Sequence, residues 1–248
     1  MTTHIHEDAH DPFAEFDAAA GIGTVRDPYP VWARLREQTP VFVGSTAEEL
    51  GVTPLREAMV DEADVYTPLT FAAVQQVLRD GETFSSAGYG DSIGLVFGHS
   101  ILEMDEPEHH AYRALIQQAF TRKAMEAWET ELVVPIVDEL IDTFIDDGRA
   151  ELVSSLMFPF PVNVIAGLLN LPRADLPLFH RLTVELISVS IDMEVALQAS
   201  RGLEEYLTPI IHQQREAPGR DMISCLATAE HDGHTLSDAE IVAFCRLL

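Results

Sequence analysis

Residues 104–123, MDEPEHHAYRALIQQAFTRK, decide the fold, because they combine a helix start with a candidate binding pair. Asp105 is a favourable N-cap residue, and Glu108 three positions later completes a capping-box pattern. Pro107 is tolerated in the first turn, where its missing N–H needs no partner. The apolar side chains further along recur on one side, so the stretch predicts an amphipathic helix.

His109 and Arg113 are separated by four positions within this predicted helix, so their side chains project side by side. An imidazole and a guanidinium placed in this way form a good receptor for a carboxylate or a phosphate. A purely structural alternative remains open, in which Arg113 pairs with a nearby acid and His109 is an ordinary surface or core histidine.

Composition restricts the partners that this chain can have. Its 248 residues are 47% hydrophobic, enough to bury the core of one or two domains. Lys and Arg number 15 against 41 Asp and Glu, a formal net charge of −26, which argues against nucleic acid and against an anionic membrane surface as partners.

Sequence signals for export and membrane insertion are not found. The first residues lack the basic and apolar regions of a signal peptide, and no apolar run reaches the roughly 18 residues of a membrane span. The two cysteines, Cys225 and Cys245, are more typical of a reducing compartment than of a disulfide framework. We therefore expect a cytoplasmic protein.

The N-terminal third of the sequence predicts a small region that contains both helices and strands. Residues 1–26 are polar and predict a partly ordered arm. A short helix is expected after Asp27, short strands at 41–43 and 65–67, and a helix over 71–80 that ends at a glycine.

The remaining two thirds of the chain predict helices almost throughout, with one expected kink at Pro135 and a capping box, Ser237 and Glu240, opening the last one. The apolar residues recur at helical spacing in segments 124–147, 162–171, 175–190, 193–216, 221–229 and 237–248.

The run Asp-x-Pro-Glu-His-x-x-x-Arg at 105–113, followed by Ala-Phe-Thr-Arg at 119–122, resembles the C-helix signature of bacterial cytochrome P-450 enzymes. Further segments are also similar to that family, namely Phe-Ser-Ser at 84–86 and the Phe-Pro-Phe-Pro stretch within 158–172. Glu106 departs mildly from the family, which more often has Pro or Gly there. The resemblance implies that His109 and Arg113 hold a haem propionate.

The same resemblance implies a fold class. It is mainly α with a small β-sheet near the N-terminus, a cytochrome P-450 fold truncated early in its long central helix. Residues 27–248 would then be the N-terminal portion of a single, incomplete domain, preceded by the arm at 1–26.

The implied activity of the complete protein is a haem-dependent monooxygenase. Such an enzyme inserts one O₂-derived oxygen atom into a small apolar substrate and takes electrons from a ferredoxin-type partner. Arg122 and Lys123, a small basic spot just after the signature, are a possible contact for that partner.

Two apolar groups would line the substrate channel of such an enzyme, although core packing is the alternative for both. The candidates are Leu95, Val96 and Phe97 in the glycine-rich segment 87–103, and Leu186 with Ile187 in the helix 175–190.

Three family features are absent from these residues: the Ala-Gly-x-x-Thr oxygen-activating segment, the Glu-x-x-Arg pair and the loop with the iron-binding cysteine. Neither Cys225 nor Cys245 lies in such a loop, and this type of haem chemistry needs an axial thiolate. We therefore assign no catalytic residue and no metal ligand, and expect the chain alone to be inactive and doubtful as a haem binder.

Two other classes of function were weighed against this one. A non-catalytic helical module that uses His109 and Arg113 to bind an anionic ligand remains an alternative. A helical di-iron protein needs two Glu-x-x-His motifs on separate helices, and among the predicted helices only Glu106 with His109 supplies one, so that class is set aside.

Overall fold

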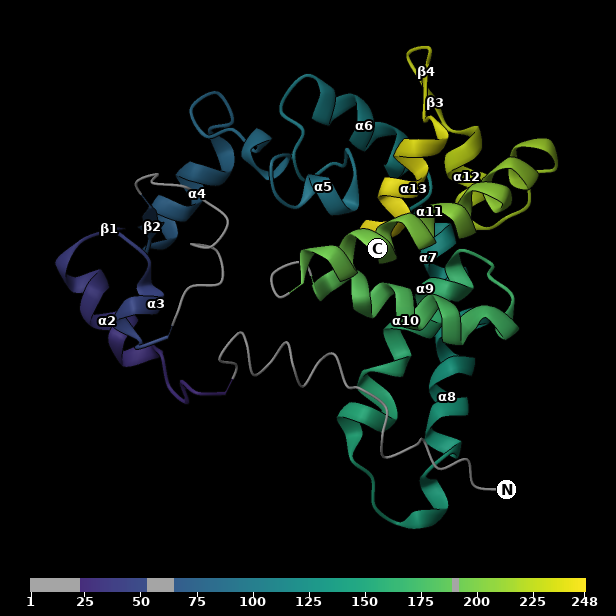
Figure 1. Ribbon diagram of the computed structural model, residues 1–248, viewed down its shortest axis with the longest axis horizontal. Coiled ribbons are helices and arrows are strands. Elements are labelled where there is room, and N and C mark those ends of the chain that lie inside the picture. Colours follow the sequence, from purple (N-terminus) through teal and green to yellow (C-terminus); the bar gives the residue numbers. More distant parts are fainter. Residues whose placement is uncertain (1–22, 53–64, 189–191) are drawn as a thin grey trace.

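The computed structural model describes residues 23–52, 65–188 and 192–248, and Figure 1 gives its arrangement. Most of the predicted arm at 1–26 lies outside the described residues. Elements of the N-terminal third gather at one side of the molecule, and helices of the C-terminal half gather at the other (Figure 1). The prediction of a mainly α fold with a small sheet near the N-terminus is confirmed.

The N-terminal group consists of helix α2 (Tyr29–Gln38), strand β1 (Val41–Val43), helix α3 (Thr46–Glu49), strand β2 (Tyr66–Pro68) and helix α4 (Phe71–Arg79). The two strands pair antiparallel, and Phe42 lies opposite Thr67. Thr70 caps α4 by accepting a hydrogen bond from the Ala73 N–H, which explains why the helix begins at the expected position.

A connecting region leads to the signature helix. It contains the 3₁₀ turn η2 (Ala87–Tyr89) and the short helix α5 (Gly94–Phe97), and it ends at α6 (Glu108–Gln117). The sequence predicted only a glycine-rich loop at 87–103, so the helical turn of α5 was missed. It forms because Val96 is fully buried and the Ser200 hydroxyl donates a 2.6 Å hydrogen bond to the Val96 carbonyl.

The long helical segment after α6 is broken where the sequence indicated. Helix α7 (Arg122–Trp128) passes into a π-helical turn, η3 (Glu129–Val133), before α8 (Val134–Asp142). Pro135 lies in the first turn of α8, so the wide turn precedes the residue that cannot donate a backbone hydrogen bond. A 3₁₀ turn, η4 (Ile145–Asp147), then ends at Gly148, whose left-handed backbone is typical of a helix terminus.

Helix α9 (Pro159–Leu168) follows a second π turn, η5 (Val153–Met157), and begins three residues before the predicted start at 162. The prediction was wrong because Pro159 and Pro161 were assigned to the approach to the helix. Both lie in its first turn, where a missing N–H has no intrahelical partner to lose.

The C-terminal half is organised around helix α11 (Met193–Glu216). Helices α10 (Leu176–Ile187), α12 (Met222–Thr228) and α13 (Asp238–Leu247) pack on it. The 3₁₀ turn η6 (Arg173–Asp175) precedes α10 and accepts a hydrogen bond from Tyr206 of α11 through Asp175. Leu203, Leu207 and Ile211 of α11 are at most 1% exposed, so this helix forms the centre of the main hydrophobic core. The predicted capping box of α13 is confirmed, with Ser237 and Glu240 bonded to each other's backbone N–H.

Between α12 and α13 lies a two-stranded hairpin of β3 (Glu230–His231) and β4 (His234–Thr235). Asp232 and Gly233 form its turn with positive φ angles of 50° and 79°. This backbone suits an Asp-Gly pair and matches the twist of a tight hairpin. The sequence was interpreted only as a turn here, and these strands were not predicted.

Aromatic rings connect helices that are far apart in the sequence. Phe120, just after α6, contacts Trp128 of α7 and Phe244 of α13 edge to face, with ring centroids 5.7 and 6.3 Å apart. In the N-terminal group, Tyr29 and Trp32 of α2 form a separate pair with centroids 5.7 Å apart. No helix in the described parts of the chain is long and apolar enough to cross a membrane.

Candidate functional site

Helix α6 is held against the core by one face and exposes the other. Tyr112, Leu115 and Ile116 are buried, and the Tyr112 hydroxyl donates a 3.0 Å hydrogen bond to the Glu240 carbonyl at the start of α13. Burial raises the pKa of the Tyr112 hydroxyl, so it stays a protonated donor. At the other end of α6, the Gln118 amide donates to the Glu230 carbonyl of β3. The exposed face therefore has a fixed orientation.

The start of α6 differs from the predicted capping box. Its first residue is Glu108, and no side chain caps it. Asp105 instead accepts hydrogen bonds from the Ser85 hydroxyl and from the Ser86 N–H at 2.8 Å, and these bonds lower the pKa of its carboxyl group. The capping prediction was wrong because partners twenty residues upstream in the sequence engage the side chain first.

His109 and Arg113 lie on the same helix, as predicted. The His109 Nδ1 atom is 3.1 Å from Glu106 Oε1, and this contact lowers the pKa of the Glu106 carboxyl group. Glu106 also accepts a hydrogen bond from the His110 N–H. With Nδ1 directed at Glu106, the imidazole keeps Nε2 available for a ligand.

Arg113 is exposed, and within the described residues its guanidinium has no hydrogen-bond or ion-pair partner. The described residues therefore do not show the structural alternative, in which Arg113 pairs with a nearby acid. A guanidinium with free donors, one turn beyond a half-buried imidazole, is chemically suited to a carboxylate such as a haem propionate. The role of the two residues stays a proposal.

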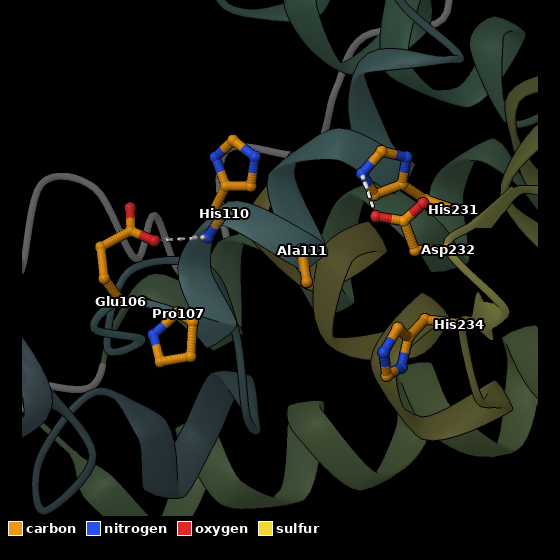
Figure 2. Close-up of a pocket in the computed structure, with 7 residues that line it drawn as sticks. All are labelled: Glu106, Pro107, His110, Ala111, His231, Asp232 and His234. Atoms are coloured by element: carbon orange, nitrogen blue, oxygen red, sulfur yellow. Dashed lines mark hydrogen bonds and ion pairs between the residues drawn. The ribbon is translucent and has the colours of Figure 1, made fainter.

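A surface pocket of about 370 Å³ lies beside this site (Figure 2). Its walls come from the start of α6 and from the β3–β4 hairpin, and the imidazoles of His110, His231 and His234 lie around it (Figure 2). In the parts of the chain that are described, no group of three or more His, Cys, Asp or Glu residues could hold a metal ion. The lining residues are Glu106, Pro107, His110, Ala111, His231, Asp232 and His234.

The predicted substrate-lining residues do not share one environment. Val96 and Leu186 are 0% and 1% exposed and belong to the main core, whereas Leu95 and Ile187 are largely exposed. Phe97 packs partly buried against the same core. Packing thus accounts for Val96 and Leu186 as they stand, and a role in lining a channel stays a prediction for all five.

The basic spot after α6 is smaller than the sequence indicated. The Arg122 Nε donates a 2.8 Å hydrogen bond to Glu126 one turn further along α7, so its charge is partly compensated. Lys123 is exposed beside it.

Neither cysteine is in a setting that would favour a thiolate. Cys245 is buried in α13, and burial raises the pKa of its thiol to about 12. Burial, with a smaller effect from Asp221, also raises the pKa of Cys225. A metal-binding or nucleophilic cysteine normally needs a lowered pKa, and neither thiol has one in these surroundings. That neither cysteine binds iron stays a prediction.

We expect Cys245 to react with a disulfide reagent at pH 8 at least ~100-fold more slowly in the folded protein than in urea, because a buried, protonated thiol is a poor nucleophile. The rate is measured by chromogenic thiol titration of a Cys225→Ser variant, with Cys245→Ser as the control that reports the more accessible thiol. Equal rates with and without urea would contradict the assigned burial.

Comparisons with known proteins place this geometry in context. No family model matches the chain. Cytochrome P450 monooxygenase PikC of Streptomyces venezuelae is 30% identical over 242 residues, which are 93% of this chain and 53% of that protein. Erythromycin C-12 hydroxylase of Saccharopolyspora erythraea is 30% identical over 240 residues, 92% of this chain and 52% of that protein.

Solved structures give the same result. The crystal structure of CYP109E1 from Bacillus megaterium in complex with testosterone is similar with a TM-score of 0.72 and 30% identity, covering 89% of this chain and 54% of that one. The cytochrome P450 PksS of Bacillus subtilis is similar with a TM-score of 0.74 and 25% identity over 92% of this chain and 56% of that one. The chain thus spans about half the length of the relatives it matches.

Proposed function

Because the chain belongs to the bacterial cytochrome P450 family, we propose that it forms the N-terminal, propionate-binding portion of a haem-dependent monooxygenase. The reaction proposed for the complete protein inserts one O₂-derived oxygen atom into a small apolar substrate. A ferredoxin-type protein is proposed as the electron donor. The names of two relatives, a monooxygenase and a hydroxylase, support this reaction class.

The observation that carries the proposal is the guanidinium of Arg113, which has no partner among the described residues and lies beside His109 on an anchored helix. Arg113 would donate two hydrogen bonds to a propionate, and His109 would donate one from Nε2 when its ring is doubly protonated. Glu106 would keep the imidazole oriented through Nδ1. When bound, haem supplies the oxygen-activating redox chemistry that no side chain can supply.

The described residues assign no iron ligand, so we propose that this chain alone is catalytically inactive. Cys225 and Cys245 are both held in the thiol form by their surroundings. The reduced carbon monoxide difference spectrum of the chain with added haem should lack the red-shifted Soret band of a thiolate-ligated haem. Appearance of that band would overturn the proposed inactivity.

Substituting Arg113 by Ala should weaken haem binding by about tenfold, because a charge-assisted hydrogen bond contributes about 1.5 kcal/mol or more. The Soret absorbance is titrated with haem and, in parallel, with haem dimethyl ester, whose propionates carry no charge. The wild-type chain should prefer haem to the ester, and the Arg113→Ala variant should not.

Arg181→Ala is the matched control, because Arg181 is also exposed on a helix and has no partner among the described residues. It should bind haem like the wild type. An unchanged preference for haem over its dimethyl ester in Arg113→Ala would contradict the assignment of Arg113 to a propionate.

The same experiment addresses the alternative function, a non-catalytic module for an anionic ligand. The exposed Arg113 would bind a small carboxylate as readily as a propionate. If succinate binds in an Arg113-dependent manner while haem and its ester bind equally, the alternative is favoured over the monooxygenase portion.

A further inference from the structure

His99 lies between α5 and α6 and contacts one carboxylate on each side of its ring. Its Nδ1 is 2.6 Å from Glu103 Oε1, and its Nε2 is 2.8 Å from Glu108 Oε1. Within the described part of the chain, these are the only hydrogen-bond and ion-pair partners of the ring. Glu108 is the first residue of α6 and immediately precedes His109.

The two contacts fix the protonation state of the ring. A carboxylate only accepts hydrogen bonds, and a neutral imidazole has a single N–H. Both contacts therefore exist together only when His99 carries two protons and a positive charge. Loss of one proton leaves one carboxylate without a donor.

Glu103 is the less mobile of the two acids. Its side chain is only 9% exposed, whereas that of Glu108 is 58% exposed. The Glu103 carboxylate lies over Gly94 so closely that a Cβ at this glycine would collide with it. A nearly buried carboxylate keeps its donor in preference to an exposed one, so deprotonation of His99 should release Glu108 first.

We propose that His99 is a positioning residue that works as a pH-dependent clasp between the α5–α6 connection and the first turn of α6. Protonated, it holds Glu108 and thereby fixes the turn that carries His109. Deprotonated, it keeps only Glu103 and lets that turn loosen. The clasp itself stands on the geometry alone, and its consequence for haem rests on the proposed function.

The direction of the pH dependence follows from the surrounding charges. The hydrogen bonds that His99 donates to Glu108 and, with a smaller effect, to Glu103 raise the pKa of His99 above its usual value of 6.5. The clasp is therefore complete at pH values below 6.5 at which carboxylates are still ionised, and it is lost as the pH rises through the raised pKa of His99 in the folded state.

Other charged groups nearby are already engaged. Asp105 is bonded to the segment at Ser85, and Glu106 to His109. Arg246 of α13 lies next to Gly98 in this connection and pairs with Glu204 of α11.

The clasp is tested in this chain, without haem, by following the imidazole resonances of His99 by NMR as the pH is changed. His99 should titrate above 6.5 in the wild type, and its pKa should fall in both Glu108→Gln and Glu103→Gln. The His99→Gln variant assigns the signal. His234→Gln is the matched control, because His234 is exposed on the hairpin, and it should leave the titration unchanged.

A second measurement reads the positioning role. Amide hydrogen exchange in the first turn of α6, corrected for its intrinsic pH dependence, should become about threefold faster as His99 deprotonates, the effect of a partly exposed ion pair. The His99→Gln variant should exchange at the faster rate at every pH. Its α11 amides should keep their protection, which shows that the variant is folded.

Two outcomes would overturn the proposal. One is a His99 pKa that is the same in the wild type, Glu108→Gln and Glu103→Gln. The other is a rate of amide hydrogen exchange in the first turn of α6 that does not change as His99 titrates. Neither measurement involves a ligand. Failure of the clasp is therefore distinguishable from failure of the haem proposal, which the Arg113→Ala titration tests separately. If both hold, haem affinity should decline more steeply with rising pH in the wild type than in His99→Gln.

Discussion

Replacing Leu207 by Ala is expected to lower the free energy of unfolding by about 3 kcal/mol, because it removes buried methyl groups from the centre of the core. Leu207 is 0% exposed on α11, the helix on which α10, α12 and α13 all pack. Its neighbours come from several helices, so the space left behind cannot close by moving one side chain. Urea unfolding followed by far-UV circular dichroism measures the change.

Leu78→Ala is the control for this substitution. Leu78 is 80% exposed on α4, so the same chemical change should alter the unfolding free energy by less than about 0.5 kcal/mol. Similar losses for Leu207→Ala and Leu78→Ala would contradict the placement of α11 at the centre of the core.

Replacing Arg215 by Met is expected to cost about 2 kcal/mol, less than the roughly 3–5 kcal/mol of a fully buried pair because a third of each side chain meets water. The Arg215 Nε donates to Asp238 at 2.7 Å, and its two terminal nitrogens donate to the carbonyls of Ala227 and Leu236. One guanidinium thus joins the end of α11 to the end of α12 and the start of α13. Thermal and urea unfolding of the variant measure the loss.

The pH dependence of this loss provides a second readout. The hydrogen bond from Arg215 holds the pKa of the Asp238 carboxyl group below its usual value, so its stabilisation is present above about pH 4 and is lost as the pH falls through the lowered pKa. The difference between wild type and Arg215→Met should therefore shrink in acid. Arg220→Met, at an exposed position without a partner among the described residues, should unfold like the wild type at every pH.

Elements with local signals were predictable from the sequence. Helix α13 begins at a capping box formed by Ser237 and Glu240, and both partners lie within four residues. The wide turn before Pro135 likewise follows from a residue that lacks a backbone N–H. Such features depend on the chain within one turn, so a pattern of letters is enough to find them.

The start of α6 was predicted wrongly for the opposite reason. Asp105 and Glu108 have the letters of a capping box, but they bond to Ser85 and His99 instead. These partners lie twenty and nine residues away, so no helical or strand period relates them. Capping propensity describes the hydrogen bonds that a side chain can make within its own helix turn. A partner that tertiary packing brings close can engage the same side chain instead.

The candidate site shows the same division. That His109 and Arg113 share a helix was predictable from their spacing, and the contact of His109 with Glu106 also follows helical geometry. The exposure of Arg113 and the involvement of His99 were not predictable, because both depend on how the connection after α5 folds back. The deep burial of Val96 depends on Ser200 of α11, more than a hundred residues away.

The separation of the N-terminal group from the helical core has a spectroscopic consequence. The chain has two tryptophans: Trp32 of α2 contacts Tyr29 edge to face, and Trp128 of α7 contacts Phe120 edge to face. Each part of the molecule therefore carries one indole. Intrinsic fluorescence would thus follow the unfolding of each part separately, with no added label. The Trp128→Phe variant reports the N-terminal group through Trp32, and the Trp32→Phe variant reports the helical core through Trp128.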